Sequence, residues 1–299
     1  TLQKIRVNRE VVLSAGAINS PKILMCSGIG DPEILKASGV PTKLPLPGVG
    51  RNLQDHPSIS IAVKRSKPGP FLQNMRADRV AVAMARAYWQ GKGWATNLPS
   101  GITGFANIGE DREAPDLQFL FAAAPFDAAP YFPPFTKPFE DGFSLRVAVL
   151  HPRSRGTVSI NENESAAPPR IQMNLLEDTK DICLLRQGVE MIRKILSRKP
   201  LAHYVQAEIV STTNRWNRED IDRYIRSRAV TVHHPCGTCR MGREDDPEAV
   251  VDPKLRVRGL ANLRVADASI MPELVSGNIN ATVSMIAEKA ATLMLEESS

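Results

Sequence analysis

The sequence contains no apolar run long enough to cross a membrane. A spanning helix needs about 20 consecutive apolar residues, and no such run occurs among the 299 residues. Residues 1–7 show no signal-peptide pattern, and the chain starts with Thr1 rather than Met. We therefore expect no integral membrane segment, and we interpret the chain as one that begins inside a domain.

Cysteine is scarce, with four residues at Cys26, Cys183, Cys236 and Cys239. This number does not suggest a disulfide framework in a chain of this size and suits a reducing compartment, so we expect a cytoplasmic protein. The spacing Cys236-x-x-Cys239 invites a redox or zinc interpretation. Zinc would need two more nearby ligands, which only the adjacent histidines could supply in strained geometry. We therefore expect small buried cysteines and no metal site.

The chain also lacks a dense basic block interleaved with aromatic residues. Its net charge is +6, from 38 basic and 32 acidic residues, and the basic residues are scattered. Charge alone leaves a nucleic-acid surface open, but a scattered excess is more typical of a solvated surface. We expect no nucleic-acid partner.

The residues that are present can build a large core, because 42% of them are hydrophobic. Alternating patterns predict strands at 58–64, 116–122 and 144–150. Helical periodicity predicts helices at 79–88 and 178–196. Strands followed by helices indicate an antiparallel sheet with helices on one side. The expected class is therefore mixed, α+β or α/β.

Two helix patterns in this region are specific enough to test. Asn217 and Asp220 are spaced as in a capping box. The helix at 178–196 has one apolar face, on which we place Ile182, Leu185, Val189, Ile192 and Ile195. The loop at 123–139 is rich in proline and aromatic residues. Its aromatic side chains either line a substrate channel or pack the loop onto the body, and the members we consider are Phe126, Tyr131, Phe132 and Phe135.

The segment at 232–242 reads V-H-H-P-C-G-T-C-R-M-G and is the most informative stretch of the chain. Pro235 lacks a backbone donor and biases the preceding residue away from helix. Gly237 and Gly242 permit close backbone approach. A histidine held in such a bend can act as a base near neutral pH, since its ordinary pKa is about 6.5.

A strand expected at 6–14 leads into G-A-I-N-S-P-K-I-L-M-C-S-G-I-G at 16–30. Ser20 is a good helix N-cap, and Pro21 suits the first helical position. A strand that enters a helix through Ala-Gly lets backbone amides approach a cofactor. A plain β–α turn explains the composition equally well.

Near the C-terminus, a strand expected at 262–266 enters a turn of small residues, and a helix is expected at 282–295. Asn278 and Asn280 precede this helix. One of them is expected to be the N-cap. The positive helix end can also face a ring that becomes anionic on reduction, and both interpretations can hold together.

Residues 45–57 form a loop by their proline and glycine content and end in Asp55-His56-Pro57. His56 invites a catalytic interpretation. We prefer a structural role for it, as part of a hydrogen-bonded brace.

Together these stretches resemble the glucose–methanol–choline (GMC) family of flavoprotein oxidoreductases. The histidine segment is similar to the family motif H-x-x-G-T-x-x-M-G, residues 16–30 to its second signature, and residues 48–57 to G-V-G-x-N-L-x-D-H-P. Residues 250–291 resemble the C-terminal portion of these proteins, whereas the middle of the chain matches only loosely.

The resemblance implies bound FAD and assigns roles to residues. His234 occupies the position of the catalytic base, and Asn278 occupies that of its partner, which is His or Asn within the family. The residues implied to lie at the cofactor are Ala15, Gly16, His233, Asp267, Ala268 and Asn280. For Asp267 a turn-forming role is the alternative. The implied reaction is oxidation of a small-molecule alcohol by hydride transfer to flavin, with oxygen or a quinone-type acceptor receiving the electrons.

One departure from the family pattern matters. The dinucleotide fingerprint G-x-G-x-x-G after an N-terminal strand is absent, since Gly28-x-Gly30 and Gly48-x-Gly50 lack the third glycine. We therefore expect a C-terminal fragment that lacks the dinucleotide-binding unit. The alternatives are a non-catalytic remnant, a half that works only with a partner, and a flavin-containing lyase on the same fold.

The expected organisation has three segments. Residues 1–57 form part of an FAD-binding domain, residues 58–227 form a substrate-binding domain, and residues 228–299 return to the FAD-binding domain with the active-site residues.

Overall fold

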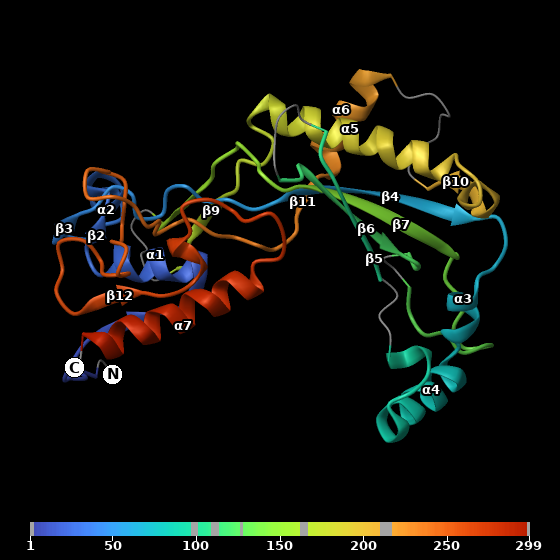
Figure 1. Ribbon diagram of the computed structural model, residues 1–299, viewed down its shortest axis with the longest axis horizontal. Coiled ribbons are helices and arrows are strands. Elements are labelled where there is room, and N and C mark those ends of the chain that lie inside the picture. The colour runs from blue at the N-terminus through green and yellow to red at the C-terminus, as the bar shows by residue number, and fades with distance from the viewer. Residues whose placement is uncertain are drawn as a thin grey trace. The chain divides into compact units, whose positions relative to one another are not determined.

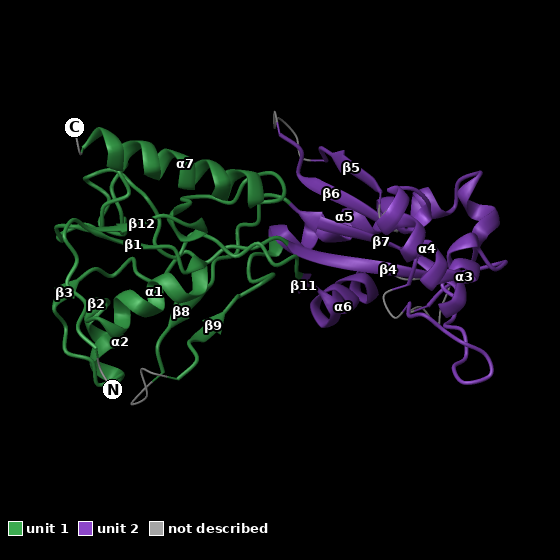
Figure 2. Ribbon diagram, turned by 90° about the horizontal axis from the view of Figure 1, so that it is seen from below, with its two compact units in different colours: residues 1–56, 150–179, 231–299 green, residues 57–149, 180–230 purple. Residues whose placement is uncertain are grey.

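The computed structural model describes residues 3–96, 101–108, 114–125, 128–161, 167–209 and 217–297 (Figure 1). The chain divides into two compact units, coloured green and purple in Figure 2. Unit 1 comprises residues 1–56, 150–179 and 231–299, and unit 2 comprises residues 57–149 and 180–230. Phe126, one of the aromatic candidates, lies outside the described residues.

Unit 2 is built on a six-stranded sheet with the central order β10-β4-β7-β6-β5, and β11 (Val230–Thr231) also pairs with β4. The other strands are β4 (Pro57–Arg65), β5 (Ile102–Ala106), β6 (Leu117–Ala122), β7 (Gly142–Val149) and β10 (Val205–Glu208). All pairs along the central path are antiparallel. The predicted mixed class with an antiparallel sheet and helices is therefore confirmed.

Two helices of unit 2 cover one face of this sheet, α5 (Thr179–Leu196) and α6 (Arg218–Arg228) (Figure 1). Helix α5 approaches the sheet closely at Gly188, where an added Cβ would lie 2.6 Å from Val147 Cγ2. Arg186 of α5 forms an ion pair with Asp222 of α6.

The two local helix predictions had different outcomes. The capping box at Asn217 and Asp220 is confirmed at the start of α6. On α5, the prediction that Ile195 belongs to the buried face is wrong, because Ile195 is exposed and Leu196 is buried instead. The buried positions continue the spacing of three and four residues, so the apolar face passes through residue 196 rather than 195.

The remaining helices of unit 2 are short, apart from α4. They are α3 (Pro70–Asn74), α4 (Ala77–Gln90) and the 3₁₀ helices η1 (Trp94–Thr96) and η2 (Leu201–Tyr204). Helix α4 ends at Gly91, which has a left-handed backbone. Within α4 only Ala83 is buried.

Unit 1 contains short strands in two-stranded sheets. Strand β1 (Val11–Leu13) pairs in parallel with β12 (Leu263–Val265), β2 (Ile29–Gly30) with β3 (Leu44–Pro45), and β8 (Thr157–Ser159) pairs antiparallel with β9 (Arg170–Gln172). The strand predicted at 6–14 is therefore shorter than expected. Only residues 11–13 find a partner strand, and residues 6–9 are exposed.

The helices of unit 1 are α1 (Gly16–Cys26), α2 (Pro32–Ala37), the 3₁₀ helix η3 (Ala268–Ile270) and α7 (Asn280–Glu296). Helix α1 begins at Gly16, so the prediction that Ser20 caps it is wrong. The hydroxyl of Ser20 instead donates to Asp267, and Pro21 lies inside the helix.

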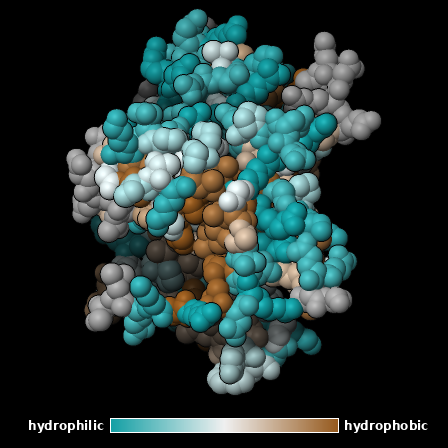
Figure 3. All heavy atoms as spheres, turned by 90° about the vertical axis from the view of Figure 1, so that its left-hand side faces the viewer, coloured by the Kyte–Doolittle hydropathy of each residue, from teal (hydrophilic) through white to brown (hydrophobic). Residues whose placement is uncertain are grey.

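The core of unit 1 joins segments that are distant in sequence, including Leu24 and Met25 of α1, Val265 of β12 and Ile286 of α7. Apolar side chains also gather in a strip on the face shown in Figure 3. Large exposed apolar residues of this unit include Val11, Val12, Ile23, Met285 and Leu295.

The two units differ from the expected segments in one respect. Residues 150–179 belong to unit 1 rather than to the region expected at 58–227. Backbone hydrogen bonds explain this, because Val158 of β8 donates to Gly50, and Leu53 and Gly156 exchange a pair of bonds. These bonds hold the β8 segment against the loop at 48–57.

Candidate active site

The candidate site lies within unit 1, where Asp55 holds the histidine segment in a tight bend. His233 adopts a left-handed backbone with a φ of 65°. The amide of His234 donates to both carboxylate oxygens of Asp55 at 3.1 Å, and the Thr231 hydroxyl donates to the same carboxylate. The amide of His233 in turn donates to the Thr231 hydroxyl at 2.7 Å. Because Asp55 is buried, these bonds fix the position of the His234 backbone.

This bend places the His234 ring beside Asn278. The Asn278 Nδ2 atom lies 3.4 Å from His234 Nε2, although 44 residues separate the two positions. An amide nitrogen only donates, so Nε2 of His234 is the acceptor in this contact and its lone pair faces Asn278. The structure therefore brings together the two residues that the sequence predicts to be catalytic.

His56 supports the same pair from the buried side. Its Nε2 donates to the carbonyl of Gly277 at 3.2 Å. Its ring meets the His234 ring edge-on, with 5.5 Å between centroids and 83° between planes. His56 is fully buried, so the expected role as a hydrogen-bonded brace is confirmed, and its hydrogen bond reaches the residue next to Asn278.

The surroundings of His234 favour the neutral imidazole. Burial lowers the pKa of His234 below its ordinary value of 6.5, and the nearby His233 lowers it further, whereas the Asp55 carboxylate raises it. The Nδ1 atom of His234 is buried and has no hydrogen-bond partner in the described part of the chain. Buried polar atoms of this kind are uncommon and recur at functional sites.

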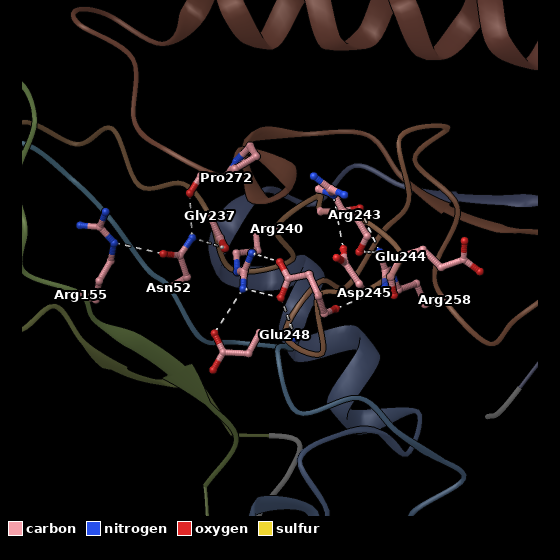
Figure 4. A network of polar contacts seen from close by, with 12 residues as sticks. Asn52, Arg155, Gly237, Arg240, Arg243, Glu244, Asp245, Glu248, Arg258 and Pro272 are labelled. Carbon is pink, nitrogen blue, oxygen red and sulfur yellow. Dashed lines mark hydrogen bonds and ion pairs between the residues drawn. The ribbon is translucent and has the colours of Figure 1, made fainter.

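A network of polar side chains ties the histidine segment to the segment that precedes Asn278 (Figure 4). Asn52 donates from Nδ2 to the carbonyls of Gly237 and Pro272, at 3.3 and 3.1 Å. Arg155 donates to Asn52 Oδ1 at 3.1 Å. Gln54 donates to Pro272 at 3.0 Å and accepts from the Leu274 amide at 3.2 Å. The loop at 48–57 therefore positions both halves of the site.

A second contact of the histidine segment supports helix α1. Pro21 inside α1 has no amide hydrogen, so the carbonyl four residues earlier, that of Ala17, loses its helical donor. The buried Thr238 hydroxyl replaces this donor and contacts Ala17 O at 2.6 Å. The Thr of the motif therefore meets a structural need of α1 that was not predicted from the sequence.

The N-terminus of α1 forms a small cradle. Gly16 has a φ of 82°, and a Cβ added there would meet no atom of the described chain within 4 Å. Ala15 is exposed. Asp267 accepts from the Gly16 amide at 2.9 Å and from the Ser20 hydroxyl at 2.5 Å. Asp267 also caps η3 through the Ser269 amide at 2.7 Å, so its carboxylate has the turn-forming role given as the alternative.

The N-terminus of α7 is open in a similar way. The helix starts at Asn280, and its N-cap residue Ile279 makes no side-chain capping bond among the described residues. The prediction that Asn278 or Asn280 is the N-cap is therefore wrong. Ile279 already has helical dihedral angles, φ −77° and ψ −9°, and the side chain of Asn278 contacts His234 instead.

The other predicted residues are placed as follows. His233 is exposed, next to the bend. Ala268 is buried, and its carbonyl accepts from the Gly237 amide at 3.2 Å. The Nε2 atom of His151 lies 2.9 Å from Ser276 Oγ. This contact supports the segment that carries Asn278.

The two cysteines of the motif belong to the core, as predicted. Cys236 and Cys239 are fully buried, and burial raises the pKa of Cys236 to about 12 and raises that of Cys239 as well. Among the described residues no group of His, Cys, Asp and Glu is arranged to hold a metal ion. No described helix is long and apolar enough to cross a membrane.

Comparison with known families identifies the class to which the chain belongs. Two family models match the chain, at residues 1–58 and at residues 152–287, and both describe GMC oxidoreductases. The chain therefore belongs to the GMC oxidoreductase family.

Individual relatives include dehydrogenases and oxidases. The chain is 37% identical over 295 residues to the alcohol dehydrogenase (acceptor) of Pseudomonas putida, covering 96% of this chain and 51% of the relative. It is 37% identical over 289 residues to the mitochondrial choline dehydrogenase of Homo sapiens, with coverage of 96% and 48%. The chain thus spans about half the length of the curated relatives it matches.

Solved structures show the same fold. Pyridoxine 4-oxidase from Mesorbium loti is 33% identical, with a TM-score of 0.76 over 95% of this chain and 50% of that protein. A variant of formate oxidase from Aspergillus oryzae RIB40, studied for FAD modification, is 25% identical with a TM-score of 0.82 over 97% and 54%.

Proposed function

We propose that the full-length protein containing this chain oxidises a small-molecule alcohol to an aldehyde or ketone, with FAD as cofactor. The single observation that carries the proposal is the approach of Asn278 Nδ2 to His234 Nε2 at 3.4 Å. A base and a neutral donor that meet at one point can both reach the same hydroxyl group.

In the proposed reaction, the substrate loses a hydroxyl proton and a hydride from the same carbon. His234 takes the proton on Nε2 after the substrate hydroxyl has replaced the Asn278 N–H as the hydrogen-bond partner of this nitrogen. The burial that lowers the pKa of His234 keeps the ring neutral at pH 7. A positioned base of this kind contributes about 10² to 10⁴ in rate. Asn278 donates to the substrate oxygen and orients it without competing for the proton.

The residues at two helix N-termini fit FAD. At α1 the exposed Ala15 and the unobstructed Gly16 leave room for a ring or phosphate to approach the backbone. At α7 the positive end at Asn280 has no side-chain cap among the described residues, so it suits an anionic group. Bound FAD would supply the hydride acceptor, a role that no side chain can fill.

The remaining cofactor contacts that we propose come from the segments between these helices. Asp267 and Ala268 would contact FAD through their backbone, because the Asp267 carboxylate is already bonded to α1 and η3. The exposed His233 would lie against the cofactor. The electron acceptor that we propose is oxygen or a quinone-type compound, and the location that we propose is the cytoplasm.

The test is anaerobic mixing of the full-length protein with a panel of primary and secondary alcohols while flavin absorbance is followed. At least one alcohol should bleach the flavin and yield the matching aldehyde or ketone. Product formation without bleaching would favour the lyase alternative and contradict the proposal.

One observation favours the alternative of a non-catalytic or partner-dependent protein. These 299 residues contain no G-x-G-x-x-G fingerprint, which is the expected phosphate-binding element of a dinucleotide site. If the full-length protein is colourless and remains so after FAD is added, the chain belongs to a non-catalytic or partner-dependent relative.

A further inference from the structure

Helix α4 of unit 2 exposes large apolar side chains that the proposed function does not use. The exposed fractions are 86% for Tyr88, 79% for Trp89, 70% for Val82 and 59% for Met84. The rings of Tyr88 and Trp89 meet edge-on at 6.0 Å. Single exposed apolar residues are ordinary, but a continuous group of large ones on one helix marks an interaction surface.

Three of these residues, Val82, Tyr88 and Trp89, share the outward side of the helix. At 100° per residue, the buried Ala83 and the half-buried Val80 and Ala87 face unit 2. Val82, Tyr88 and Trp89 lie on the remaining side, which we call the outer face of α4, and Met84 lies between this face and the packed one. The helix therefore carries apolar side chains on its exposed side as well as on its packed side.

Contacts before and after α4 fix the position of this helix. The Ala77 amide donates to the Tyr131 carbonyl at 2.8 Å, and the Tyr131 amide donates to Met75 at 3.1 Å. After the helix, Trp94 contacts the ring of Phe71 edge-on at 6.5 Å. The outer face is therefore presented by a helix with fixed ends.

Positive charges border the outer face. Arg79 and Arg86 lie on one edge of it, about two helical turns apart, and Lys92 follows the helix C-terminus. The one acidic residue of the helix, Asp78, forms an ion pair with Arg76. Apolar and aromatic side chains bordered by basic ones complement an anionic lipid surface, in which rings enter the acyl boundary and basic groups meet phosphates.

A second pair of exposed rings, those of Phe132 and Phe135, lies near the N-terminus of α4. Phe132 and Phe135 stack with their planes parallel and 6.0 Å between centroids, and Phe135 is 82% exposed. They follow Tyr131, whose backbone bonds to both sides of the α3–α4 junction. We propose that the outer face of α4 binds the surface of an anionic lipid bilayer, as an interfacial helix that does not span it.

The test uses the full-length protein and sedimentation with two kinds of vesicle. One is made of phosphatidylcholine and phosphatidylglycerol in equal parts, and the other of phosphatidylcholine alone. Wild-type protein should sediment with the anionic vesicles, and added salt should weaken this binding. The double substitution Tyr88→Ser/Trp89→Ser should lower the partition coefficient by about tenfold or more, because two exposed rings no longer leave water.

Two further variants make the result specific. Ile102→Ser removes a side chain of similar exposure, 69%, from β5 and should bind like wild type. Arg79→Glu/Arg86→Glu should lower binding to the anionic vesicles by about twentyfold or more, since each basic residue contributes about fivefold. This charge variant also stands in if the ring variant fails to fold, which a thermal unfolding scan would reveal.

Three results would overturn the proposal. The first is equal sedimentation of wild-type protein with both kinds of vesicle or with neither. The second is undiminished binding by the folded ring variant and by the charge variant. The third is a wild-type dimer that the ring variant converts to a monomer in size-exclusion chromatography, because a second copy would then cover the outer face.

Discussion

Asp55 and Thr238 shape the candidate site although neither takes part in the proposed proton transfer. Asp55 accepts from the backbone amide of His234 and from the side-chain hydroxyl of Thr231, and Thr238 restores the bond that Pro21 removes from α1. Both are buried polar side chains with partners far away in sequence. Their substitution should therefore affect one measurable property each, the pH dependence for Asp55 and the stability for Thr238.

The acid limb of the pH profile tests Asp55. Burial lowers the pKa of His234, and the Asp55 carboxylate partly offsets this by raising it. The acid limb of kcat/KM in the wild-type protein should therefore lie below about 6.5, and Asp55→Asn should move it to still lower pH. Asp31→Asn, which removes a carboxylate paired with Arg51, should leave the limb in place. A shift of the acid limb to higher pH in Asp55→Asn would contradict this account.

Thr238→Val tests the replacement bond in α1. Valine has a similar shape but no hydroxyl, so the Ala17 carbonyl would lose its buried donor. The free energy of unfolding should fall by about 1–3 kcal/mol, as measured by urea denaturation. Thr238→Ser keeps the hydroxyl and should recover most of the loss. Equal stability of the valine and serine variants would show that the bond does not matter.

At the scale of elements, the loop at 48–57 organises unit 1 because it bonds to several distant segments. Gly50 donates to Thr238 at 2.8 Å and accepts from Val158 of β8 at 2.7 Å. This close approach requires glycine, since an added Cβ would lie 2.1 Å from the Val158 carbonyl oxygen. The loop, the histidine segment and β8 therefore meet at a residue without a side chain.

Gly50→Ala and Gly39→Ala form a matched pair that isolates this close approach. Both glycines have a positive φ, 81° and 69°, but a Cβ on Gly39 would meet no described atom within 4 Å. Gly39→Ala should cost only the left-handed backbone, about 1–2 kcal/mol. Gly50→Ala should cost at least about 2 kcal/mol more, because the backbone must move apart. Similar unfolding midpoints for the two variants would contradict the steric explanation.

The elements also show what could be predicted from the sequence. Alternation and periodicity indicate the sheet of unit 2 and helix α5 because these signals are local. The start of α1 was not predictable in the same way. Pro21 normally ends or begins a helix, and the donor that lets α1 continue through it comes from Thr238, 221 residues away from Ala17. Similarly, Ile279 replaces the expected asparagine cap because Asn278 contacts His234.

At the scale of the whole molecule, the candidate active-site residues converge although they come from three distant parts of the chain. Asp55, His234 and Asn278 meet within unit 1. Family motifs indicate which residues belong together, whereas the braces that hold them, such as Asn52 and Gln54, depend on contacts that no local pattern reveals. The chain spans about half of its curated relatives, so measurements of activity belong to the full-length protein.

The central claim is that His234 accepts the substrate proton. The most direct measurement is the anaerobic rate of flavin reduction by an active alcohol in the full-length protein and in His234→Ala, with flavin absorbance confirming that FAD is retained. We predict a rate at least about 10² lower in His234→Ala and a clearly smaller loss in His233→Ala. Near-normal flavin reduction by His234→Ala would contradict the account.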